Sequence, residues 1–577
     1  MNCSNWVELL MWRARDMPQG IAFGFTPNGV EDEICFTYAQ LDHAARKIAA
    51  ALQHAGLAGE RAVILYPPGP DYVCALMGCL YAGVTAVPVY APRQNASYAR
   101  VMQILSSARA AVLLSSDKVL ATLCQPEWVK MEQAGLRRLA TDTLASSLAE
   151  QWRMPDISAD TLAVLQYTSG STGRPKGVRL CHRHLLANSR VIARAMDCNR
   201  ESVIVSWLPP YHDMGLIGGV LQPMYCGVPL HLMSPATFLQ RPVRWLEAIG
   251  RYRGTHSPAP NFAYELCVKR IRAEQLSTLD LSSWRVAGNG AEPIRAAVLR
   301  EFCEVFAPAG FDPRAFFPCY GMAEATLYIA GSAVFSGAHT LQASRDALMA
   351  GVIQAGDAGD KIELVSSGAI DADAAAGADI RIVNPSSHQP CGAGQIGEIW
   401  IAGDSVADGY WEQPEASADT FHARLPGSDC NWLRTGDLGG IRDGELYVTG
   451  RIKNLIIIRG QNHYPHDIET TVAGLHPALR ANGAAAFSID HADGERLGLV
   501  LELERHALDA DLVSLAAIVR DAVSLHHQLQ IDRLAFVRAG DIPRTSSGKI
   551  QHYLARRLLL QGDLPVIEAH QKDVACQ

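Results

Sequence analysis

The sequence lacks the features that mark nucleic-acid-binding and membrane proteins. It has no tract rich in lysine and arginine, and the 577-residue chain carries a formal net charge of −8. A polyanionic nucleic acid is therefore not an expected partner. No apolar run approaches the roughly 20 residues that a membrane-spanning helix needs, so we expect no integral membrane segment. The first residues do not resemble a signal peptide, and we expect a cytoplasmic protein.

Cysteine pairs at metal-binding or redox spacing are absent as well. The 14 cysteines are scattered without a C-x-x-C pair, which argues against a disulfide framework and favours reduced thiols in the core. Cys181, His182 and His184 stand close together, but their spacing fits no standard zinc pattern. We interpret this segment as the start of a helix.

The early part of the chain alternates between predicted strands and helices. Thr37 and Gln40 form a capping box ahead of an amphipathic run. An apolar strand at Arg61–Tyr66, a helix at Asp71–Ala82 and a strand at Val84–Tyr90 follow. This βαβ pattern predicts a layered α/β domain.

The pattern of predicted elements changes twice further along the chain. After Gly392 it becomes a series of short strands and turns, and a compact unit follows Gly450. That unit has a predicted strand at Leu497–Leu503, a helix at Asp511–His526 and a strand at Arg533–Val537. The fold class that we predict is α/β: a large N-terminal part with layered α/β sheets and a β-rich piece, then a small mobile α+β C-terminal domain.

The run QYTSGSTGRPKGV, residues 166–178, has the composition of an anion-binding loop. Its glycines allow close backbone approach, and its hydroxyls and lysine can donate to phosphate oxygens. A strand at Leu162–Gln166 precedes it, and a helix from about His184 to Met196 follows, which is a common setting for phosphate binding. It is not a Walker loop, because Pro175 stands where glycine is required. An ordinary Ser/Gly surface turn is the alternative.

Six further motifs follow in a fixed order along the chain. They are SWLPPYHDMGL (206–216), NGAEP (289–293), CYGMAEAT (319–326), LRTGDLG (433–439), GRIKNLIIIRGQNHYPHDIE (450–469) and PRTSSGKI (543–550). Together with the glycine-rich loop, this set resembles the adenylate-forming superfamily of acyl-CoA synthetases, amino-acid adenylation domains and luciferases. The resemblance covers nearly the whole chain.

The resemblance implies an ATP site with Mg²⁺. The residues implied in holding ATP are Thr168, Ser169, Gly170, Ser171, Thr172, Gly173 and Lys176 at the phosphates; Gly290, Ala291, Glu292, Tyr320, Gly321 and Met322 at the adenine and α-phosphate; and Asp437 and Arg451 at the ribose. Glu324 and Thr168 would ligate Mg²⁺. Lys549 would bridge the attacking carboxylate and the α-phosphate. Taken singly, Glu324 could be an acid at a helix start, Asp437 a turn residue and Lys549 a solvated charge.

Within the superfamily, the large-domain motifs and NHYPHDIE look closest to fatty acyl-AMP ligases. These enzymes load fatty acids onto acyl carrier proteins and generally reject coenzyme A. By analogy, the fatty acid would lie near Trp207, His212, Met214 and Gly215, with His212 also among the catalytic residues. A satisfied core histidine is the alternative for His212. The chain ends without a carrier-like segment, so we expect the holo acyl carrier protein to be a separate partner.

The resemblance also implies two domains, an adenylate-forming domain at 1–451 and a mobile domain at 452–577, with the hinge at Lys453. A segment within Ser332–Asp360 is longer than acyl-CoA synthetases usually need, and its part Leu341–Gln354 looks helical. In fatty acyl-AMP ligases such an insertion packs against the C-terminal domain. An inconsequential surface loop is the alternative.

Three other functions remain open at this stage. An ordinary medium- or long-chain acyl-CoA synthetase would share most of the motifs. Asp213 could anchor the ammonium group of an amino acid, as in an amino-acid adenylation domain. A non-catalytic adenylate-binding or carrier-docking protein would need a broken site, whereas none of the expected polar residues is missing.

Overall fold

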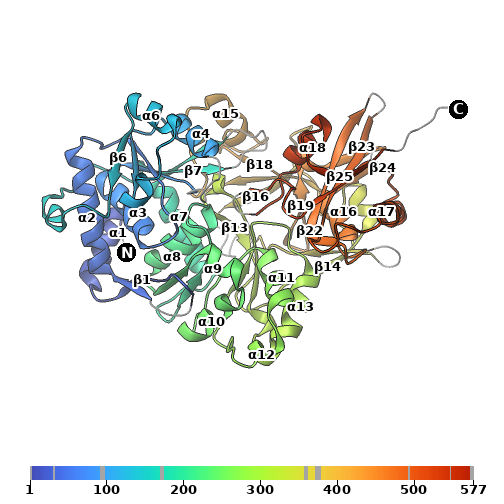
Figure 1. The fold of residues 1–577 in the computed structure, drawn as a ribbon, viewed down its shortest axis with the longest axis horizontal. Helices are drawn as coiled ribbons and strands as arrows, with labels where there is room; N and C mark the ends of the chain where they lie inside the picture. Colours follow the sequence, from blue (N-terminus) through green and yellow to red (C-terminus); the bar gives the residue numbers. More distant parts are fainter. Residues whose placement is uncertain are drawn as a thin grey trace.

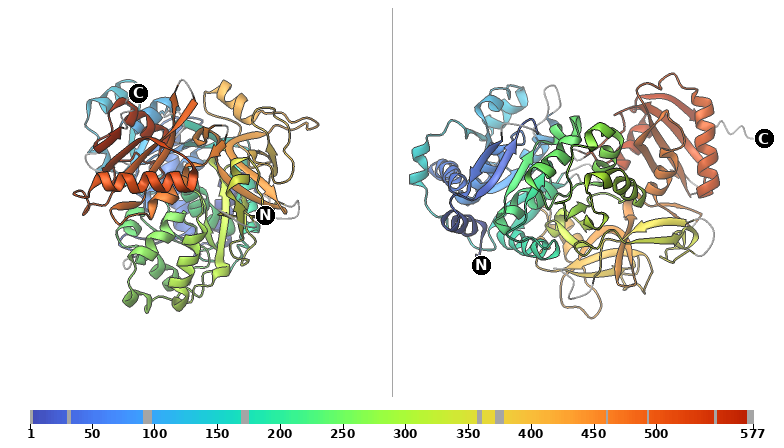
Figure 2. Two further views of the ribbon diagram at one scale, coloured as in Figure 1. Left: turned by 90° about the vertical axis from the view of Figure 1, so that its right-hand side faces the viewer. Right: turned by 90° about the horizontal axis from the view of Figure 1, so that it is seen from below.

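The computed structural model describes residues 3–29, 33–90, 98–168, 175–356, 361–370, 378–459, 461–491, 494–545 and 548–571. Figures 1 and 2 show the elements spread along one long axis. The N-terminal sheet lies at one end, and the C-terminal elements, in orange and red, lie at the other. The middle of the chain, in green and yellow, lies between them. Within the described ranges, no helix is long and apolar enough to span a membrane.

The N-terminal sheet has six strands in the order β6-β5-β3-β4-β7-β8, all parallel except β8. Its strands are β3 Arg61–Ile64, β4 Thr85–Pro88, β5 Val112–Ser115, β6 Arg137–Ala140, β7 Leu162–Thr168 and β8 Lys176–Cys181; the helices of this region are α1 Trp6–Asp16, α2 Tyr38–His54, α3 Pro70–Ala82, α4 Ala99–Ala108, α5 Asp117–Leu120, α6 Pro126–Gln133 and α7 His182–Ala195. In β3, Ala62 packs with α2 and α3, whereas Val63 packs with α4 and α6 on the opposite face. Helices therefore cover both faces, as a parallel sheet requires.

Most of the predictions for this region are confirmed. The capping box at α2 is present, since the Gln40 N–H donates to Thr37 Oγ1 (3.2 Å) and the Thr37 N–H donates to Gln40 Oε1 (2.9 Å). The predicted βαβ unit corresponds to β3, α3 and β4, and α7 begins at His182. One prediction is wrong: the glycine-rich loop does not lead directly into a helix. It joins β7 to the antiparallel strand β8, in which Thr168 lies opposite Lys176.

Two smaller sheets form the middle of the molecule. One has the order β2-β1-β10-β9 and the other the order β11-β12-β13. Their strands are β1 Ile21–Thr26, β2 Ile34–Thr37, β9 Ile204–Ser206, β10 Leu230–Met233, β11 Ala287–Asn289, β12 Phe316–Gly321 and β13 Tyr328–Gly331; the helices are α8 Gln222–Cys226, α9 Pro235–Gln240, α10 Val243–Tyr252, α11 Asn261–Arg270, α12 Ala273–Leu276 and α13 Ala296–Phe306. Trp207, Trp245, Tyr264 and Phe302 belong to the aromatic core that joins these helices to the sheets.

The next segment is rich in β-structure, as predicted after Gly392, but its first strands already lie before that residue. Strands β14 Thr340–Ser344 and β15 Lys361–Val365 pair antiparallel, and β16 Asp379–Val383, β17 Gly397–Ala402, β18 Leu433–Arg442 and β19 Glu445–Arg451 form a four-stranded sheet in chain order. Helix α15 covers Pro414–Phe421. The helix predicted over Leu341–Gln354 is largely wrong, because residues 340–344 form β14 and only Arg345–Met349 form a short helix, α14. Cross-strand pairing with β15 outweighs the helical pattern here.

The C-terminal unit is a four-stranded sheet with helices on both faces. Its elements are β20 Ile456–Ile458, β21 Gln461–His463, α16 Pro465–Ala473, β22 Leu479–His491, β23 Gly494–Leu503, α17 Leu512–His527, β24 Ile531–Arg538, α18 His552–Gln561 and β25 Val566–Gln571. In β23, Leu499 packs with α16 and α17, and Val500 packs with α18. The two strands and the helix predicted in this unit are confirmed as β23, β24 and α17. The cysteines that the structure describes are free thiols, as expected.

Candidate active site

A cavity of about 3570 Å³ lies between the C-terminal unit and the rest of the molecule. It is larger than the roughly 300–1,000 Å³ of common ligand pockets, because it continues into the cleft between the two parts. Every predicted site residue that the structure describes lines it: Thr168, Lys176, Trp207, His212, Met214, Gly215, Gly290, Ala291, Glu292, Tyr320, Gly321, Met322, Glu324, Asp437, Arg451, Lys453 and Lys549. The predicted phosphate contacts Ser169, Gly170, Ser171, Thr172 and Gly173 lie outside the described residues.

The end of the glycine-rich loop is fixed by an aromatic side chain. The Lys176 ammonium lies over the ring of Tyr410, 4.4 Å from its centroid. Partial burial lowers the pKa of Lys176, and the charge of Lys453 acts in the same direction. The Lys176 ammonium, at the start of β8, therefore lies at the cavity.

The NGAEP motif begins at the end of β11 and turns sharply into the cavity. A Cβ at Gly290 would lie 2.8 Å from the Cys319 carbonyl oxygen, so the backbone can approach β12 only with glycine there. The Glu292 carboxylate accepts the Phe262 N–H at 2.5 Å, in the first turn of α11. Burial raises the pKa of Glu292, and this hydrogen bond opposes the shift. Glu292 therefore ties the motif to α11.

Asp437 joins three strands at the floor of the cavity. Its Oδ2 accepts the Tyr320 hydroxyl at 2.7 Å, and its Oδ1 accepts Arg451 Nε at 2.7 Å. Asp437 and Arg451 are register partners on β18 and β19, and Asp437 as a whole residue is only 4% exposed. Gly321, next to Tyr320, permits a contact that a Cβ would bring to 1.9 Å from the Leu327 carbonyl oxygen. Tyr320, expected near the adenine and α-phosphate, thus forms one hydrogen-bonded group with the ribose-binding candidates Asp437 and Arg451.

Glu324 has a partner that the sequence analysis did not identify. The Tyr410 hydroxyl donates to Glu324 Oε1 at 2.9 Å, and the Ala407 N–H donates to the Glu324 carbonyl at 2.9 Å. Burial raises the pKa of Glu324, and the Tyr410 hydroxyl works against this by stabilising the ionised form. Tyr410 lies in a stretch interpreted only as short strands and turns. The aromatic pair Tyr410-Trp411 is the one feature of that stretch that could have indicated a functional residue.

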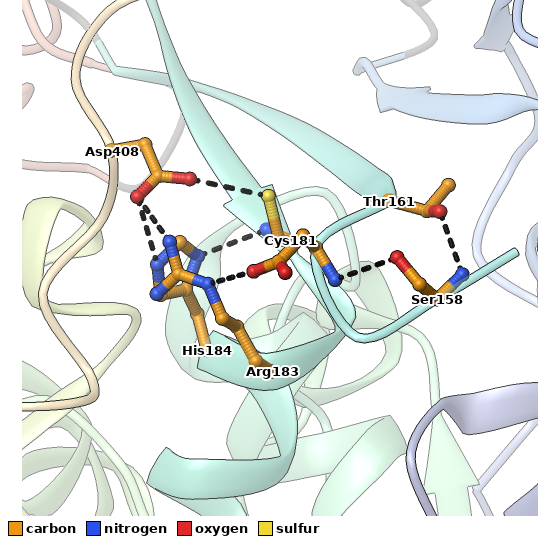
Figure 3. A network of polar contacts seen from close by, with 7 residues as sticks. Ser158, Thr161, Cys181, Arg183, His184 and Asp408 are labelled. Atoms are coloured by element: carbon orange, nitrogen blue, oxygen red, sulfur yellow. Dashed lines mark hydrogen bonds and ion pairs between the residues drawn. The ribbon is translucent and has the colours of Figure 1, made fainter.

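The loop that carries Tyr410 is anchored through Asp408 (Figure 3). Arg183 donates to Asp408 Oδ1, the Cys181 thiol donates to Oδ2 at 3.3 Å, and His184 Nε2 lies 3.5 Å from Oδ1. His184 Nδ1 accepts the Cys181 N–H at 3.0 Å, so the ring proton is on Nε2. Burial raises the pKa of Cys181 to about 12.

Cys181, His184 and Asp408 have ligand atoms within 4.8 Å of one another, a spacing that could hold a metal ion. The thiol proton and the Nε2 proton occupy the positions from which Cys181 and His184 would bind it. Arg183 also neutralises the carboxylate. These contacts make the cluster an anchor that joins residues 405–411 to the start of α7.

Lys549 projects into the cavity from a hairpin whose described residues are 543–545 and 548–551. Arg544 and Ile550 bridge the hairpin, and the Lys549 N–H donates to Thr545 Oγ1 at 3.1 Å. The side chain is solvent-exposed inside the cleft, yet the cleft walls partly desolvate it and lower its pKa, while the charge of Asp213 opposes the shift. The hairpin therefore presents its lysine to the wall that carries Asp213 and Glu292.

The predicted acid pocket lies around the start of a π-helix, Met214–Leu221. A Cβ at Gly215 would lie 2.0 Å from the Pro209 carbonyl oxygen, so this turn requires glycine. Trp207 is only 3% exposed and stacks on Phe238 with ring centroids 4.0 Å apart. The His212 ring lies 5.1 Å from the ring of Tyr211. Trp207 is thus a rigid wall of the pocket.

The predicted hinge residue, Lys453, lies in a short 3₁₀ helix, Ile452–Asn454, between β19 and β20. The predicted insertion reaches the C-terminal unit, because Arg345 Nη1 of α14 lies 3.5 Å from His527 Nδ1 of α17. The segment that carries α14 therefore contacts the C-terminal unit.

Comparison with known proteins places these features in a family. The family described as AMP-binding enzyme matches residues 10–411. The chain belongs to the AMP-binding enzyme family. A second family, the AMP domain of Disco-interacting protein 2-like proteins, matches residues 453–568 of this AMP-binding enzyme.

Relatives of this AMP-binding enzyme include named ligases. The medium-chain-fatty-acid–[acyl-carrier-protein] ligase JamA of Moorena producens (strain JHB) is 41% identical over 99% of this chain and 97% of that protein. The structure of fatty acyl-adenylate ligase from Legionella pneumophila, in complex with acyl adenylate and pyrophosphate, has a TM-score of 0.76 and 38% identity, covering 99% of this chain and 98% of that one. A structure from a study of the Escherichia coli and L. pneumophila fatty acyl-adenylate ligases has a TM-score of 0.85 and 31% identity over 97% and 98%. The predicted resemblance to fatty acyl-AMP ligases is confirmed.

Proposed function

We propose that this enzyme activates a fatty acid with ATP and then transfers the acyl group to an acyl carrier protein. A carboxylate oxygen attacks the α-phosphorus of ATP, the bond to the bridging oxygen breaks, and pyrophosphate leaves. The phosphopantetheine thiol of a separate holo acyl carrier protein then attacks the acyl carbonyl, and AMP leaves. The observation that carries this proposal is the convergence of Lys549, Glu324 and Asp437, from distant segments, on one cavity.

The charges around the cavity suit the first step. Both reactants are anionic, so the site must neutralise charge as they approach. Lys549, exposed in the cleft, would contact the attacking carboxylate and the α-phosphate, and Lys176 would contact the outer phosphates. Asp437 has lone pairs beyond those used by Tyr320 and Arg451, which it can offer to ribose hydroxyls. His212 would lie beside the reacting carboxylate.

Glu324 and Thr168 suit a magnesium ion. Mg²⁺ prefers oxygen ligands, and both residues present oxygen atoms to the same cavity. The Glu324 carboxylate is buried and held by Tyr410, so it is oriented before a ligand arrives. When bound, the ion would neutralise charge on the phosphates.

The acid pocket supports an alkyl substrate. Trp207, Met214 and Gly215 offer apolar and small surfaces, and a buried alkyl chain gains about 0.8 kcal/mol per CH₂. Asp213 accepts the Met214 N–H at 2.7 Å, and its charge acts on Lys549. The apolar and small lining residues therefore carry the preference for a fatty acid over an amino acid.

The transfer step would use a second pose of the C-terminal unit. We propose that residues 452–577 rotate about Lys453 relative to residues 1–451. In the pose described here, Lys549 lies in the cleft. The contact between Arg345 and His527 would restrain the rotation.

A product assay by mass spectrometry tests the proposal. Purified enzyme would be incubated with ATP, Mg²⁺ and fatty acids from about C6 to C18, with either coenzyme A or a holo carrier protein. Acyl-AMP should accumulate with coenzyme A and be consumed with the carrier. Rapid formation of acyl-CoA would instead identify an acyl-CoA synthetase. Adenylation of amino acids, with no adenylation of fatty acids, would identify an amino-acid adenylation domain.

A further inference from the structure

Glu265 provides a hydrogen-bonded connection between the part of the chain up to residue 451, called here the main body, and the C-terminal unit. It lies in α11, lines the cavity and is 5% exposed. Its Oε2 accepts the side-chain amide of Asn482, in β22, at 2.6 Å. The Asn482 carbonyl in turn accepts Arg544 Nη2 at 2.6 Å. Arg544 stands at the base of the hairpin that carries Lys549.

Other contacts fix Glu265 within the main body, and others fix the Lys549 hairpin within the C-terminal unit. On the main body, Arg295 and Lys269 pair with Glu265, and α11 is held at its first turn by Glu292. Arg295 and Lys269 keep the pKa of Glu265 below its usual value although burial alone would raise it, so Asn482 donates to an anion.

In the C-terminal unit, the fully buried Glu502 carboxylate accepts the backbone N–H groups of Gly540 and Ile542 at 3.0 and 3.2 Å. It also accepts Arg480 at 2.8 Å and Arg544 at 3.4 Å. The start of the Lys549 hairpin is therefore fixed relative to β22 and β23, and a movement of Asn482 would carry the hairpin with it.

The conformation of Asn482 suits this contact. The pairing of β22 with β23 shifts between Leu479 and Ala484, and within this irregular stretch Asn482 has φ +57. Asparagine tolerates the left-handed region better than most residues. The irregular stretch thus presents the Asn482 amide to Glu265.

The contact can also break without leaving a buried charge unpaired. If Asn482 moves away, Glu265 keeps Arg295 and Lys269, so no isolated carboxylate remains. Glu265 then loses only one hydrogen-bond donor, the side-chain amide of Asn482. Such a contact can stabilise one pose and still allow the other.

We propose that Glu265 and Asn482 are positioning residues that hold the Lys549 hairpin in the cleft for acyl-adenylate formation and separate for thioester transfer. This inference rests on the proposed two-step function. It assigns to α11 a role in selecting the pose of the C-terminal unit. Neither residue needs to contact the substrate.

Substitution of Asn482 tests this contact with little backbone strain. Asn482→Gly removes the amide and accommodates the positive φ. We expect adenylate formation to fall about 10- to 100-fold, the equivalent of one charge-assisted hydrogen bond. Asn482→Asp should cause a larger loss, because it places a carboxylate against Glu265. Transfer from preformed acyl-AMP to a holo carrier protein should stay at or above the parental rate. Gln528→Gly is the matched control, because Gln528 has φ +56 at the end of α17 and is exposed.

Hydrogen–deuterium exchange of residues 540–551 provides a readout that does not depend on activity. Exchange in this hairpin should be faster in Asn482→Gly than in the parent and in Gln528→Gly. Parental adenylation and exchange in Asn482→Gly would overturn the inference. Equal losses in both half-reactions with a lower melting temperature would also overturn it, since they indicate a merely structural role. If the parent itself forms no acyl-AMP, the proposed function fails, while the exchange comparison still tests the contact.

Discussion

The Glu324 carboxylate is held by residues from a distant loop. Tyr410 donates to its side chain, and Ala407 donates to its carbonyl oxygen. That loop is fixed in turn by Asp408, which binds Arg183 and Cys181. The geometry of the proposed metal ligand is therefore set by contacts between three separate segments of the chain.

Tyr410→Phe isolates the contribution of one hydroxyl to this arrangement. The ring remains for the contact with Lys176, but Glu324 loses the hydrogen bond that favours its ionised form. The pKa of Glu324, already raised by burial, should rise further, so the acid limb of the pH–rate profile should move to higher pH. We expect adenylation at neutral pH to fall by about 10-fold or more, measured by pyrophosphate release.

Tyr81→Phe is the matched control for this substitution. Its hydroxyl also donates to a carboxylate, Asp42, at 2.8 Å, and Tyr81 does not line the cavity. This variant should keep the parental acid limb. An unshifted acid limb in Tyr410→Phe would show that Glu324 does not need its hydroxyl partner.

The sequence motifs predicted the residues of the cavity well but not the residues that hold them. Gly290, Tyr320 and Asp437 stand in local patterns whose spacing is visible in one dimension. Tyr410 and Asn482 have no such pattern, because their partners Glu324 and Glu265 lie 86 and 217 positions away. Only the tertiary structure brings such pairs together.

At the scale of elements, the segment between β19 and β20 is short and ordered. The Leu455 N–H donates to the carbonyls of Arg451 and Ile452 at 3.1 and 3.3 Å, which closes the 3₁₀ turn around Lys453. Proline fixes φ near about −65°, a value that fits a 3₁₀ helix. The backbone φ that Lys453→Pro would impose therefore matches the 3₁₀ turn of the pose described here.

Lys453→Pro should separate the two half-reactions. Acyl-AMP formation should continue near the parental rate, whereas transfer to the holo carrier should fall strongly, because a fixed φ blocks the second pose. Single-turnover measurements of each step check this. Lys453→Ala is the control, because it removes the charge but leaves φ free to change. Parental thioester formation in Lys453→Pro would contradict a hinge at this residue.

Regular elements with buried faces were predicted accurately, and two short elements were not. Helix α2 has a long amphipathic pattern and strand β23 has a continuous buried apolar run, so their packing agrees with their local sequence. Strand β8 was missed because its six residues alternate only weakly and follow a glycine-rich loop. The segment around α14 forms strand β14 instead of helix because β15 supplies hydrogen-bond partners that no local pattern reveals.

At the scale of the whole molecule, buried neutral histidines make the main body sensitive to acid. Burial lowers the pKa of His182 and of His184 to about 4 each. His182 Nδ1 accepts the Trp6 N–H at 3.3 Å, which joins α1 to α7. Both rings must stay neutral in the fold, whereas an unfolded chain protonates them below a pH of about 6.5.

The free energy of unfolding of the main body should therefore fall as the pH decreases from about 6.5 to 4. The unfolded state binds more protons than the folded state in this range, so each histidine contributes a slope of up to about 1.4 kcal/mol per pH unit. All 10 tryptophans precede Lys453, so their fluorescence during urea unfolding reports on the main body.

His182→Gln should remove one histidine's share of this slope, whereas His506→Gln, at an exposed position of the C-terminal unit, should leave it unchanged. Carboxylates that titrate near pH 4 affect all three proteins alike, so the difference between the variants isolates the buried ring. An unchanged slope in His182→Gln would mean that the main body admits the charged ring at low pH, and that the contact between α1 and α7 does not depend on its neutral form.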